Sequence, residues 1–328
     1  MIKTPILSTI ENTYKKSLSM HIALLIITVI SLIIALLLDH MLLLFGLAQL
    51  SISVLFMIAY KVIISKKEEK PLVFDHYQPF IEPINTAIII ALLTPLRANI
   101  LVLILALIIT ILFKSMFASV FKEQLVDPIL LGLIFSQMAF GERLNISDTF
   151  ISMFEGTIED VSFIRLLIGF YEGFTISSAA FIFLAFAAIY LVIAKAIDRM
   201  ILKATIVHLT LFTVALYLFK DYTFSFLFTN LWLGPTAFSL VFLIPEYTTS
   251  PETKEGKMIY SFLVIGLFIV FRLTFKVVAS ILYALVLAQL IIWVVERFKV
   301  RTTPKRRTQV VYGTVIVWLI IITGLIVT

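Results

Sequence analysis

The sequence predicts an all-α integral membrane protein with about 11 transmembrane segments. Three observations support this fold class. The 328 residues are 61% hydrophobic and only 14% charged, with a mean hydropathy of +1.10, whereas a soluble domain carries roughly 25% charged residues. Apolar runs long enough for membrane-spanning helices follow one another along the chain. Lysine and arginine residues are also distributed unevenly between alternate connections, as in multi-pass proteins.

The predicted segments follow from length and hydropathy, because crossing the hydrocarbon core takes roughly 20 apolar residues in a helix. Residues 1–20 are polar and mixed, and we interpret them as a cytoplasmic N-terminal segment that stays in the mature protein. Three segments, beginning at Ile84, Asn99 and Pro128, look too short for a full crossing. Short segments flanked by proline are typical of broken or re-entrant helices. The eleven segments are Ile22–Leu38, Met41–Ile64, Ile84–Leu96, Asn99–Phe113, Pro128–Phe140, Ser177–Ala196, Ile201–Phe219, Phe224–Ile244, Met258–Phe275, Val277–Val295 and Val310–Val327.

The basic residues of the connections predict the orientation. With the N-terminus inside, 20 of the 26 lysines and arginines lie at the inner side and 6 at the outer side, as the positive-inside rule requires. We therefore expect a multi-pass protein of the cell membrane with a cytoplasmic N-terminus. The longest inner connection is Lys61–Pro83, whose lysines would lie against anionic membrane lipid. The longest outer connection is the acidic segment 141–160. Plain solvated connections explain both equally well.

Several function classes are excluded by composition and motifs. The chain has no cysteine, so it holds no disulfide and no thiolate metal site. No glycine signature follows a strand and no phosphate-binding loop is present, which argues against NAD and ATP. Nothing predicts a metal site, a catalytic residue or a nucleic-acid partner. His208 lies deep in an apolar run, and helix packing explains it better than ligation.

Three charged residues stand out near the membrane. Asp127 and Glu246 lie beside prolines at helix ends, where carboxylates could form part of an ion path. Helix capping is the alternative, and we favour it for Asp127 and weigh it equally for Glu246. Arg272 lies about 14 residues into its helix, where an arginine is a candidate functional residue. Snorkelling to the outer headgroups explains Arg272 equally well.

Three separated stretches resemble the NqrB/RnfD family, the membrane subunits of ion-pumping NADH:quinone and ferredoxin:NAD oxidoreductase complexes. The first is INTAIIIALLTP, at 84–95. The second is KSMFASVFKEQLVDPILLGLIF, at 114–135, similar to a stretch containing Asn-Pro-Ala-Leu-Leu-Gly. The third is PEYTTSPETKEGKMIYSFLVIGLFIVFR, at 245–272, and it is the most specific. It is similar to Asp-Pro-Val-Thr-Ser-Pro-x-Thr-x-x-Gly-Arg-Leu-Ile-Tyr, and in it Thr249, Ser250, Pro251, Thr253, Gly256, Lys257 and Tyr260 are in register.

The resemblance implies an architecture. Residues 21–298 would form a ten-helix bundle of two pseudo-symmetric halves, at about 21–140 and 177–298, separated by the outer loop 141–160. Broken helices would meet near the bilayer midplane and form the working site. Residues 299–328, a basic linker and one extra C-terminal helix, would be an addition beyond the family.

The resemblance also implies cofactors. Family members carry FMN on a threonine of Ser/Thr-Gly-Ala-Thr in the outer loop. This chain lacks that tetrapeptide, and Thr149 and then Thr157 are the nearest candidates for attachment. Ser250, Thr253 and Arg272 would help to bind a cofactor. FMN, riboflavin and quinone are the groups to expect.

The implied function is that of a membrane subunit of an electron-transport complex. Electrons would pass across or along the membrane through flavin or quinone, with coupling to Na⁺ or H⁺ movement or with transfer to a flavinylated extracytoplasmic protein. Other membrane subunits would be partners, and the chain would be at most a redox-carrier subunit rather than an enzyme alone. Two alternatives stay open: a solute permease or channel with a related broken-helix repeat, and a scaffold subunit.

Overall fold

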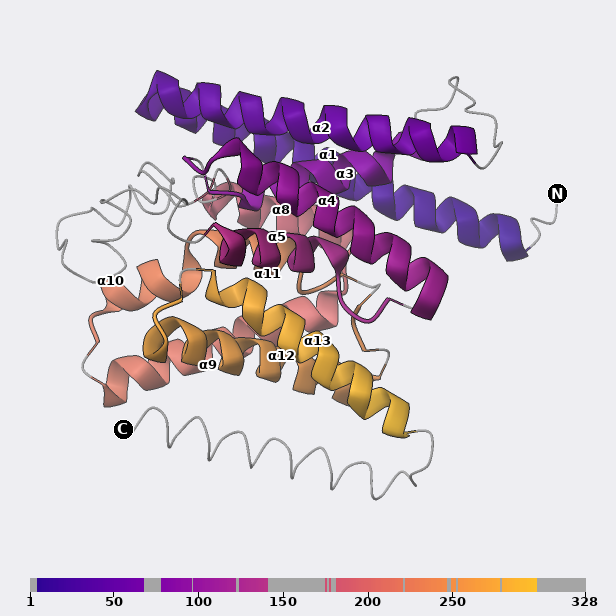
Figure 1. The fold of residues 1–328 in the computed structure, drawn as a ribbon. Helices are drawn as coiled ribbons and strands as arrows, with labels where there is room; N and C mark the ends of the chain where they lie inside the picture. Colours follow the sequence, from indigo (N-terminus) through magenta and orange to yellow (C-terminus); the bar gives the residue numbers. More distant parts are fainter. Residues whose placement is uncertain are drawn as a thin grey trace.

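The computed structural model describes residues 5–67, 78–95, 97–121, 124–140, 175, 177, 181–220, 222–246, 249–251, 253–277 and 279–299. All regular secondary structure in these ranges is helical, apart from an isolated antiparallel bridge between Pro95 and Thr175. Figure 1 shows the long helices lying side by side as a bundle. The structure therefore confirms the predicted class of an all-α membrane protein.

The helices before residue 141 form one group along the chain. α4 continues without a break into the π-helical turn Phe117–Phe121. The helices are α1 (Pro5–Leu38), α2 (His40–Lys67), α3 (Gln78–Leu93), α4 (Ile100–Met116) and α5 (Pro128–Ala139).

The helices after residue 180 form a second group. α10 continues into a π-helical turn at Phe228–Trp232, and α12 continues into another at Val270–Thr274. The helices are α8 (Phe181–Ile193), α9 (Arg199–Phe219), α10 (Phe224–Leu227), α11 (Pro235–Phe242), α12 (Lys254–Ile269) and α13 (Ser280–Lys299).

Within the described residues, five helical stretches are long and apolar enough to cross a membrane. A sixth span results if the segments Phe224–Trp232 and Pro235–Phe242, bent by 52° at a short break, count as one. The five are Thr13–Leu38, His40–Lys66, Ile100–Val120, Arg199–Phe219 and Lys254–Thr274, and the shorter apolar helices are Phe80–Leu93, Pro128–Ala139, Phe181–Ile193 and Ser280–Val294.

Ten of the eleven segments predicted from hydropathy coincide with helices, and the eleventh, 310–327, lies outside the described residues. α1 begins at Pro5, so most of the predicted N-terminal segment 1–20 belongs to this long first helix rather than to a separate element. The predicted domain limits, including the halves at 21–140 and 177–298, stay a prediction.

Two predicted segments differ from the structure. The segment starting at Asn99 is not short, because the helix runs through Lys114 into the π-helical turn and reaches 21 residues. The segment Phe224–Ile244 is not continuous. Gly234 has a positive φ of 68° and Pro235 begins α11, and this pair breaks the helix because glycine tolerates that φ and proline lacks an N–H.

Helix starts are fixed by local chemistry. A short polar side chain before the first helical residue accepts a hydrogen bond from a backbone N–H that has no partner inside the helix. The capping residues seen in this way are Asn99 for α4, Asp127 for α5, Asp198 for α9, Thr223 for α10 and Thr253 for α12.

α4 and α5 pack very closely. A Cβ placed on Gly132 of α5 would lie 2.1 Å from Oγ1 of Thr110 and 2.4 Å from the carbonyl oxygen of Ala106, both in α4. Only glycine fits this contact, since such distances lie far inside van der Waals separation. The glycine therefore lets the two backbones approach, as small residues do between helices in membranes.

The sequence of α5 repeats in α13. Pro128–Ala139 reads PILLGLIFSQMA and Ser280–Lys299 begins SILYALVLAQ, so Ile, Leu, Leu and Gln recur at the second, third, sixth and tenth positions. α3 and α11 share a second pattern, in which Thr-Ala is followed by a proline, at Thr86 to Pro95 and at Thr236 to Pro245. α5 and α13 contact each other in the bundle, so the two copies of the repeat are neighbours.

Candidate functional site

The candidate site is a buried polar cluster where the N-terminal ends of α5 and α12 meet the middle of α13. Asp127 caps α5, and its carboxylate Oδ1 accepts a hydrogen bond of 2.9 Å from the N–H of Ile129. Asp127 is only 4% exposed. Asp127 therefore has the capping geometry favoured from the sequence, but it places a carboxyl group in a dry environment.

Gln289 of α13 fixes the position of Asp127. The Asp127 N–H donates to Gln289 Oε1 at 3.0 Å, and Gln289 Nε2 donates to Thr249 Oγ1 at 3.0 Å. The glutamine itself is buried. One side chain thus joins the start of α5 to the segment that leads into α12.

Tyr260 of α12 lies at the same place. It is fully buried, at 0% exposure, and its hydroxyl has no hydrogen-bond partner among the described residues. The side-chain amide of Gln289 lies next to this hydroxyl. Whether Asp127 and Glu246 belong to one ion path stays a prediction.

Burial governs the ionisation of Asp127. Loss of hydration raises the pKa of this carboxyl above its ordinary value, and the hydrogen bond from Ile129 and the positive charge of Lys114 offset that effect only in part. Lys114 is itself half-exposed and forms an ion pair with Glu82 of α3. Among the residues that the structure describes, no cation forms an ion pair with the carboxyl group of Asp127.

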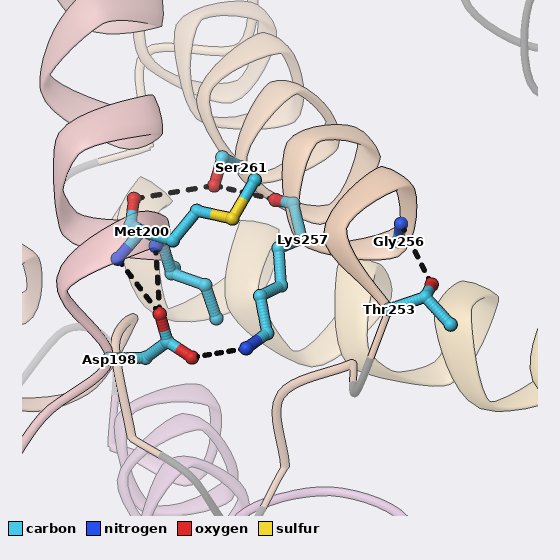
Figure 2. A network of polar contacts seen from close by, with 7 residues as sticks. Asp198, Met200, Thr253, Gly256, Lys257 and Ser261 are labelled. Carbon is cyan, nitrogen blue, oxygen red and sulfur yellow. Dashed lines mark hydrogen bonds and ion pairs between the residues drawn. The ribbon is translucent and has the colours of Figure 1, made fainter.

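A second polar network ties α9 to α12, as Figure 2 shows. Asp198 caps α9, accepting from the N–H groups of Met200 at 2.9 Å and Ile201 at 3.2 Å, and its other oxygen accepts from the Lys257 ammonium at 2.5 Å. Ser261 adds a link, because its hydroxyl lies 2.8 Å from the Lys257 carbonyl and 3.4 Å from the Ile201 carbonyl. Together these contacts hold two helix starts at fixed separation.

The ion pair determines the ionisation of Asp198. Burial alone would raise its pKa, but the Lys257 ammonium and the N–H groups of Ile201 and Met200 outweigh burial and hold the pKa below its ordinary value. The N–H of Asp198 also donates to the carbonyl oxygen of Pro245 at 2.9 Å. This bond satisfies a carbonyl just beyond the end of α11.

Arg272 lies inside the bundle. It is 5% exposed, and its Nε–H donates to the carbonyl oxygen of Asn230 at 3.1 Å. Asn230 belongs to the π-helical turn that precedes the break at Gly234. Of the two interpretations from the sequence, exposure to the outer headgroups does not fit this geometry, and Arg272 instead holds one side of the broken span.

The predicted cofactor residues are not brought together. Thr253 caps α12, with its hydroxyl accepting from the Gly256 N–H at 3.1 Å, and Ser250 precedes it. Arg272 follows 19 residues later, about 28 Å away along the helix. Thr253 and Arg272 thus lie at opposite ends of α12 and its π-helical turn, and a cofactor-binding role for Ser250, Thr253 or Arg272 stays a prediction. Thr149 and Thr157 lie outside the described residues.

Sequence reasoning missed three buried polar residues: Gln289 and Asp198, which belong to these networks, and His21, which belongs to neither. Gln289 recurs at the same helix position as Gln137, and this repeat was the available signal. Asp198 directly precedes an apolar run, which is a capping signal. His21 is buried in α1, and its Nδ1 lies 2.6 Å from Oδ1 of Asn85 in α3. His208, in contrast, packs edge-on against Phe262, as its apolar surroundings predicted.

The fold and these sites define a class of protein. Long apolar spans, half-length helices and a broken span surround buried polar networks, and no group of three or more histidine or acidic side chains in the described ranges could hold a metal ion. This is a multi-pass helical membrane protein.

Comparison with family models identifies the family. Residues 2–305 match the model of the NQR2, RnfD, RnfE family. The chain therefore belongs to this family, and the resemblance stated from its motifs is confirmed. The match ends before residues 310–327, the predicted extra helix. A comparison with curated proteins found no match. The family makes the chain a membrane subunit of the electron-transport complexes known as Na⁺-NQR and Rnf.

Proposed function

We propose that this chain carries electrons across or along the membrane, through a flavin or a quinone that it holds or that a neighbouring subunit presents to it. The match of residues 2–305 to the NQR2, RnfD, RnfE family is the observation that carries this proposal. Electrons come from a partner subunit. Movement of Na⁺ or H⁺ is coupled to their flow, or they leave toward a flavinylated extracytoplasmic protein.

The architecture supports a working site inside the bundle. α3 and α11 are half-length helices, and every residue of α11 is buried. Backbone that is not fully helical survives at membrane depth only where protein or a cavity covers it. The break at Gly234, anchored by Arg272, is such a place.

The exposed surface supports assembly with other membrane subunits. Large apolar side chains of α1, α2 and α9 point away from the bundle and are at least half exposed, and examples are Val29, Leu55, Ile63, Leu211 and Phe219. In a membrane these side chains meet lipid or the apolar helices of a neighbour. Purification of the intact complex would show whether lipid or a neighbouring subunit covers these side chains.

The cofactor is tested on purified protein. We expect visible flavin absorbance, and in-gel fluorescence under ultraviolet light after denaturation if the flavin is covalently bound. Intact mass then distinguishes the attachment sites: Thr149→Ala removes an FMN-sized increment and Thr157→Ala does not. A wild-type chain without any increment would show that covalent FMN is absent. A colourless protein that moves a solute in proteoliposomes would replace the redox proposal with a permease.

The proposed orientation has its own test. A reporter fused after Lys67 is expected on the cytoplasmic side, and one fused at Ser147 on the outer side. The opposite result for both fusions would reverse the orientation while leaving the helix arrangement intact.

A further inference from the structure

The starting observation is an apolar stripe along one side of α13. Its members are Tyr283, which is half-buried, and Leu287, Leu290 and Val294, which are 39%, 38% and 42% exposed. These residues are four, three and four positions apart, and residues spaced in this way lie on the same side of an α-helix. We call these four residues the α13 stripe. The described residues leave this side of α13 exposed.

The opposite side of α13 is packed into the bundle. α13 contacts α5, α11 and α12, and Leu285, Ala288 and Ile292 are buried. These three residues lie about half a helical turn away from the α13 stripe. α13 therefore lies at the surface of the bundle, with one side directed inward and the α13 stripe directed outward.

The next apolar segment along the chain is 310–327, the predicted extra span, which lies outside the described residues. Its sequence VVYGTVIVWLIIITGLIV has no charged residue and is long enough for a membrane-spanning helix. The match to the family model ends at residue 305. The segment is therefore not one of the helices that the family shares, and it has to find a place on the surface of the bundle.

The connection to α13 limits where this segment can lie. α13 ends at Lys299, and the linker 300–309 reaches at most about 35 Å when fully extended. Basic residues hold this linker against anionic headgroups at the membrane surface where α13 ends. A helix that starts from the same surface runs antiparallel to α13, and consecutive elements with a short connection are usually neighbours. The basic residues of the linker are Arg301, Lys305, Arg306 and Arg307.

One side of the segment has the same spacing as the α13 stripe. A glycine at each end and two aliphatic residues between them are again four, three and four positions apart: Gly313, Val317, Ile320 and Gly324. In an antiparallel pair of helices, Val317 faces Leu290. Ile320 then faces Leu287, one turn further along. The glycines lie opposite the bulkier ends of the α13 stripe and allow the two backbones to approach.

We propose that residues 310–327 pack as a helix against the α13 stripe, antiparallel to α13. Lipid would meet any exposed apolar surface, whereas the short linker and the shared spacing select this segment of the same chain. The docked helix covers the α13 stripe and leaves the exposed apolar surfaces of α1, α2 and α9 to other membrane subunits. This packing does not depend on electron transfer, so it stands or falls separately from the proposed function.

The chain has no cysteine, so introduced cysteine pairs give a direct test on the purified full-length protein. One variant combines Leu290→Cys with Val317→Cys, and a second combines Leu287→Cys with Ile320→Cys. Both also carry a specific protease site inserted into the linker. A disulfide requires the two Cα atoms to lie within about 7 Å of each other. After oxidation and cleavage, we expect one full-length band on a gel without reductant and two bands with reductant.

Two matched controls use the same assay. Leu290→Cys with Val315→Cys places the second cysteine at nearly the same depth but on the opposite side of the predicted helix. Leu55→Cys with Val317→Cys uses another exposed apolar position, in α2, which Figure 1 shows at the opposite edge of the bundle from α13. Both controls should give two bands with and without reductant.

A disulfide within the chain in both facing pairs, and in neither control, supports the proposal. The proposal is overturned if neither facing pair forms a disulfide, or if Leu290→Cys reacts with Val315→Cys and not with Val317→Cys. A disulfide between two chains, seen as a band of twice the mass before cleavage, also overturns it and assigns the α13 stripe to contact with a second copy. The substituted residues of α13 are exposed, so these variants should fold.

Discussion

α5 and α13 share a sequence pattern and lie in contact, yet the polar groups at their two starts differ. α5 begins after Asp127, whose N–H is bonded to Gln289, the tenth residue of α13. α13 begins at Ser280, preceded by Ala279. Neither the Ser280 hydroxyl nor Nε2 of the matching Gln137 has a hydrogen-bond partner among the described residues. The same helical scaffold therefore carries a charged, hydrogen-bonded end in one copy and a neutral, unsatisfied end in the other.

This difference shows how a repeated helix can acquire a specialised site. The apolar residues of the repeat maintain packing in both copies, while one substitution at the capping position supplies the charge. Asp127 caps α5, and Gln289 accepts a hydrogen bond from its backbone N–H. With alanine at 279, the second copy has no acid to hold. Polar chemistry is thereby concentrated at one end of the helix pair.

The largest effect is expected from a substitution at Gly132, the fifth residue of α5, where α13 has Ala284. Gly132→Ala should destabilise the protein by about 3 kcal/mol, because the new Cβ would overlap the Ala106 carbonyl and force α4 and α5 apart. The reverse change, Ala284→Gly in α13, should cost only about 1 kcal/mol. SDS-induced unfolding in mixed micelles measures both, and equal effects would show that the close approach is not specific to α5.

The two glutamines provide the next comparison. Gln289→Leu should cost about 2 kcal/mol, since it leaves the buried Asp127 N–H and the Thr249 hydroxyl without their partner. Gln137→Leu should be close to neutral, because Gln137 Nε2 has no hydrogen bond to lose among the residues that the structure describes. The same unfolding assay applies. A larger loss at Gln137 than at Gln289 would contradict the asymmetry.

The two capping aspartates, Asp127 and Asp198, differ because only Asp198 forms an ion pair among the described residues. The pH dependence of stability should show this difference. Because the folded-state pKa of Asp198 is lowered, its ion pair with Lys257 contributes stability above pH 3.8, the ordinary value, and that stability is lost as the pH falls further through the folded pKa. Asp198→Asn should lower stability near neutral pH by about 1 kcal/mol and flatten this acid limb. The measurement is the unfolding free energy as a function of pH. If the loss of stability at acid pH is the same in Asp198→Asn as in the wild type, another group causes that loss.

The smallest effect concerns two lysines with positive φ. Lys195, with φ 56°, ends the turn after α8, and Lys276, with φ 51°, follows the π-helical turn after α12. Glycine adopts this conformation without strain, so Lys195→Gly and Lys276→Gly should each stabilise the fold by about 0.5–1 kcal/mol. A loss of stability at either position would mean that the lysine side chain makes a contact that outweighs its backbone strain.

Hydropathy predicted the helices well because each span needs a long apolar run regardless of its partners. The short segments at Ile84 and Pro128 were also predictable, since Pro95 follows the end of α3 and Pro128 begins α5, although α3 starts earlier, at Gln78, and continues through Pro83. The break at Gly234 was missed although Gly-Pro signals it, because the surrounding run is apolar enough for one continuous span. The high hydropathy of the whole segment Phe224–Ile244 therefore gave no indication of the turn at Gly234.

The polar cluster was predicted only where proline drew attention to it. Asp127 and Glu246 stood out as acids beside prolines, and the structure shows Asp127 as the N-terminal cap of α5. Gln289 offered no signal apart from its place in the α5–α13 repeat, because a single glutamine in an apolar helix is common at helix contacts. Its role depends on a partner 162 residues earlier in the chain. Such a pairing follows from tertiary packing rather than from any local pattern.

The eight residues of α11 also bear on how the protein is made. An eight-residue helix spans about 12 Å, too little to cross the bilayer by itself, and it is shielded by α8, α9 and α13. α13 is synthesised after α11, so α11 is not yet shielded by α13 when it enters the membrane. Nascent chains stopped after residue 251 should consequently be retained by insertion machinery or degraded, whereas chains extended past residue 299 should be released into the bilayer.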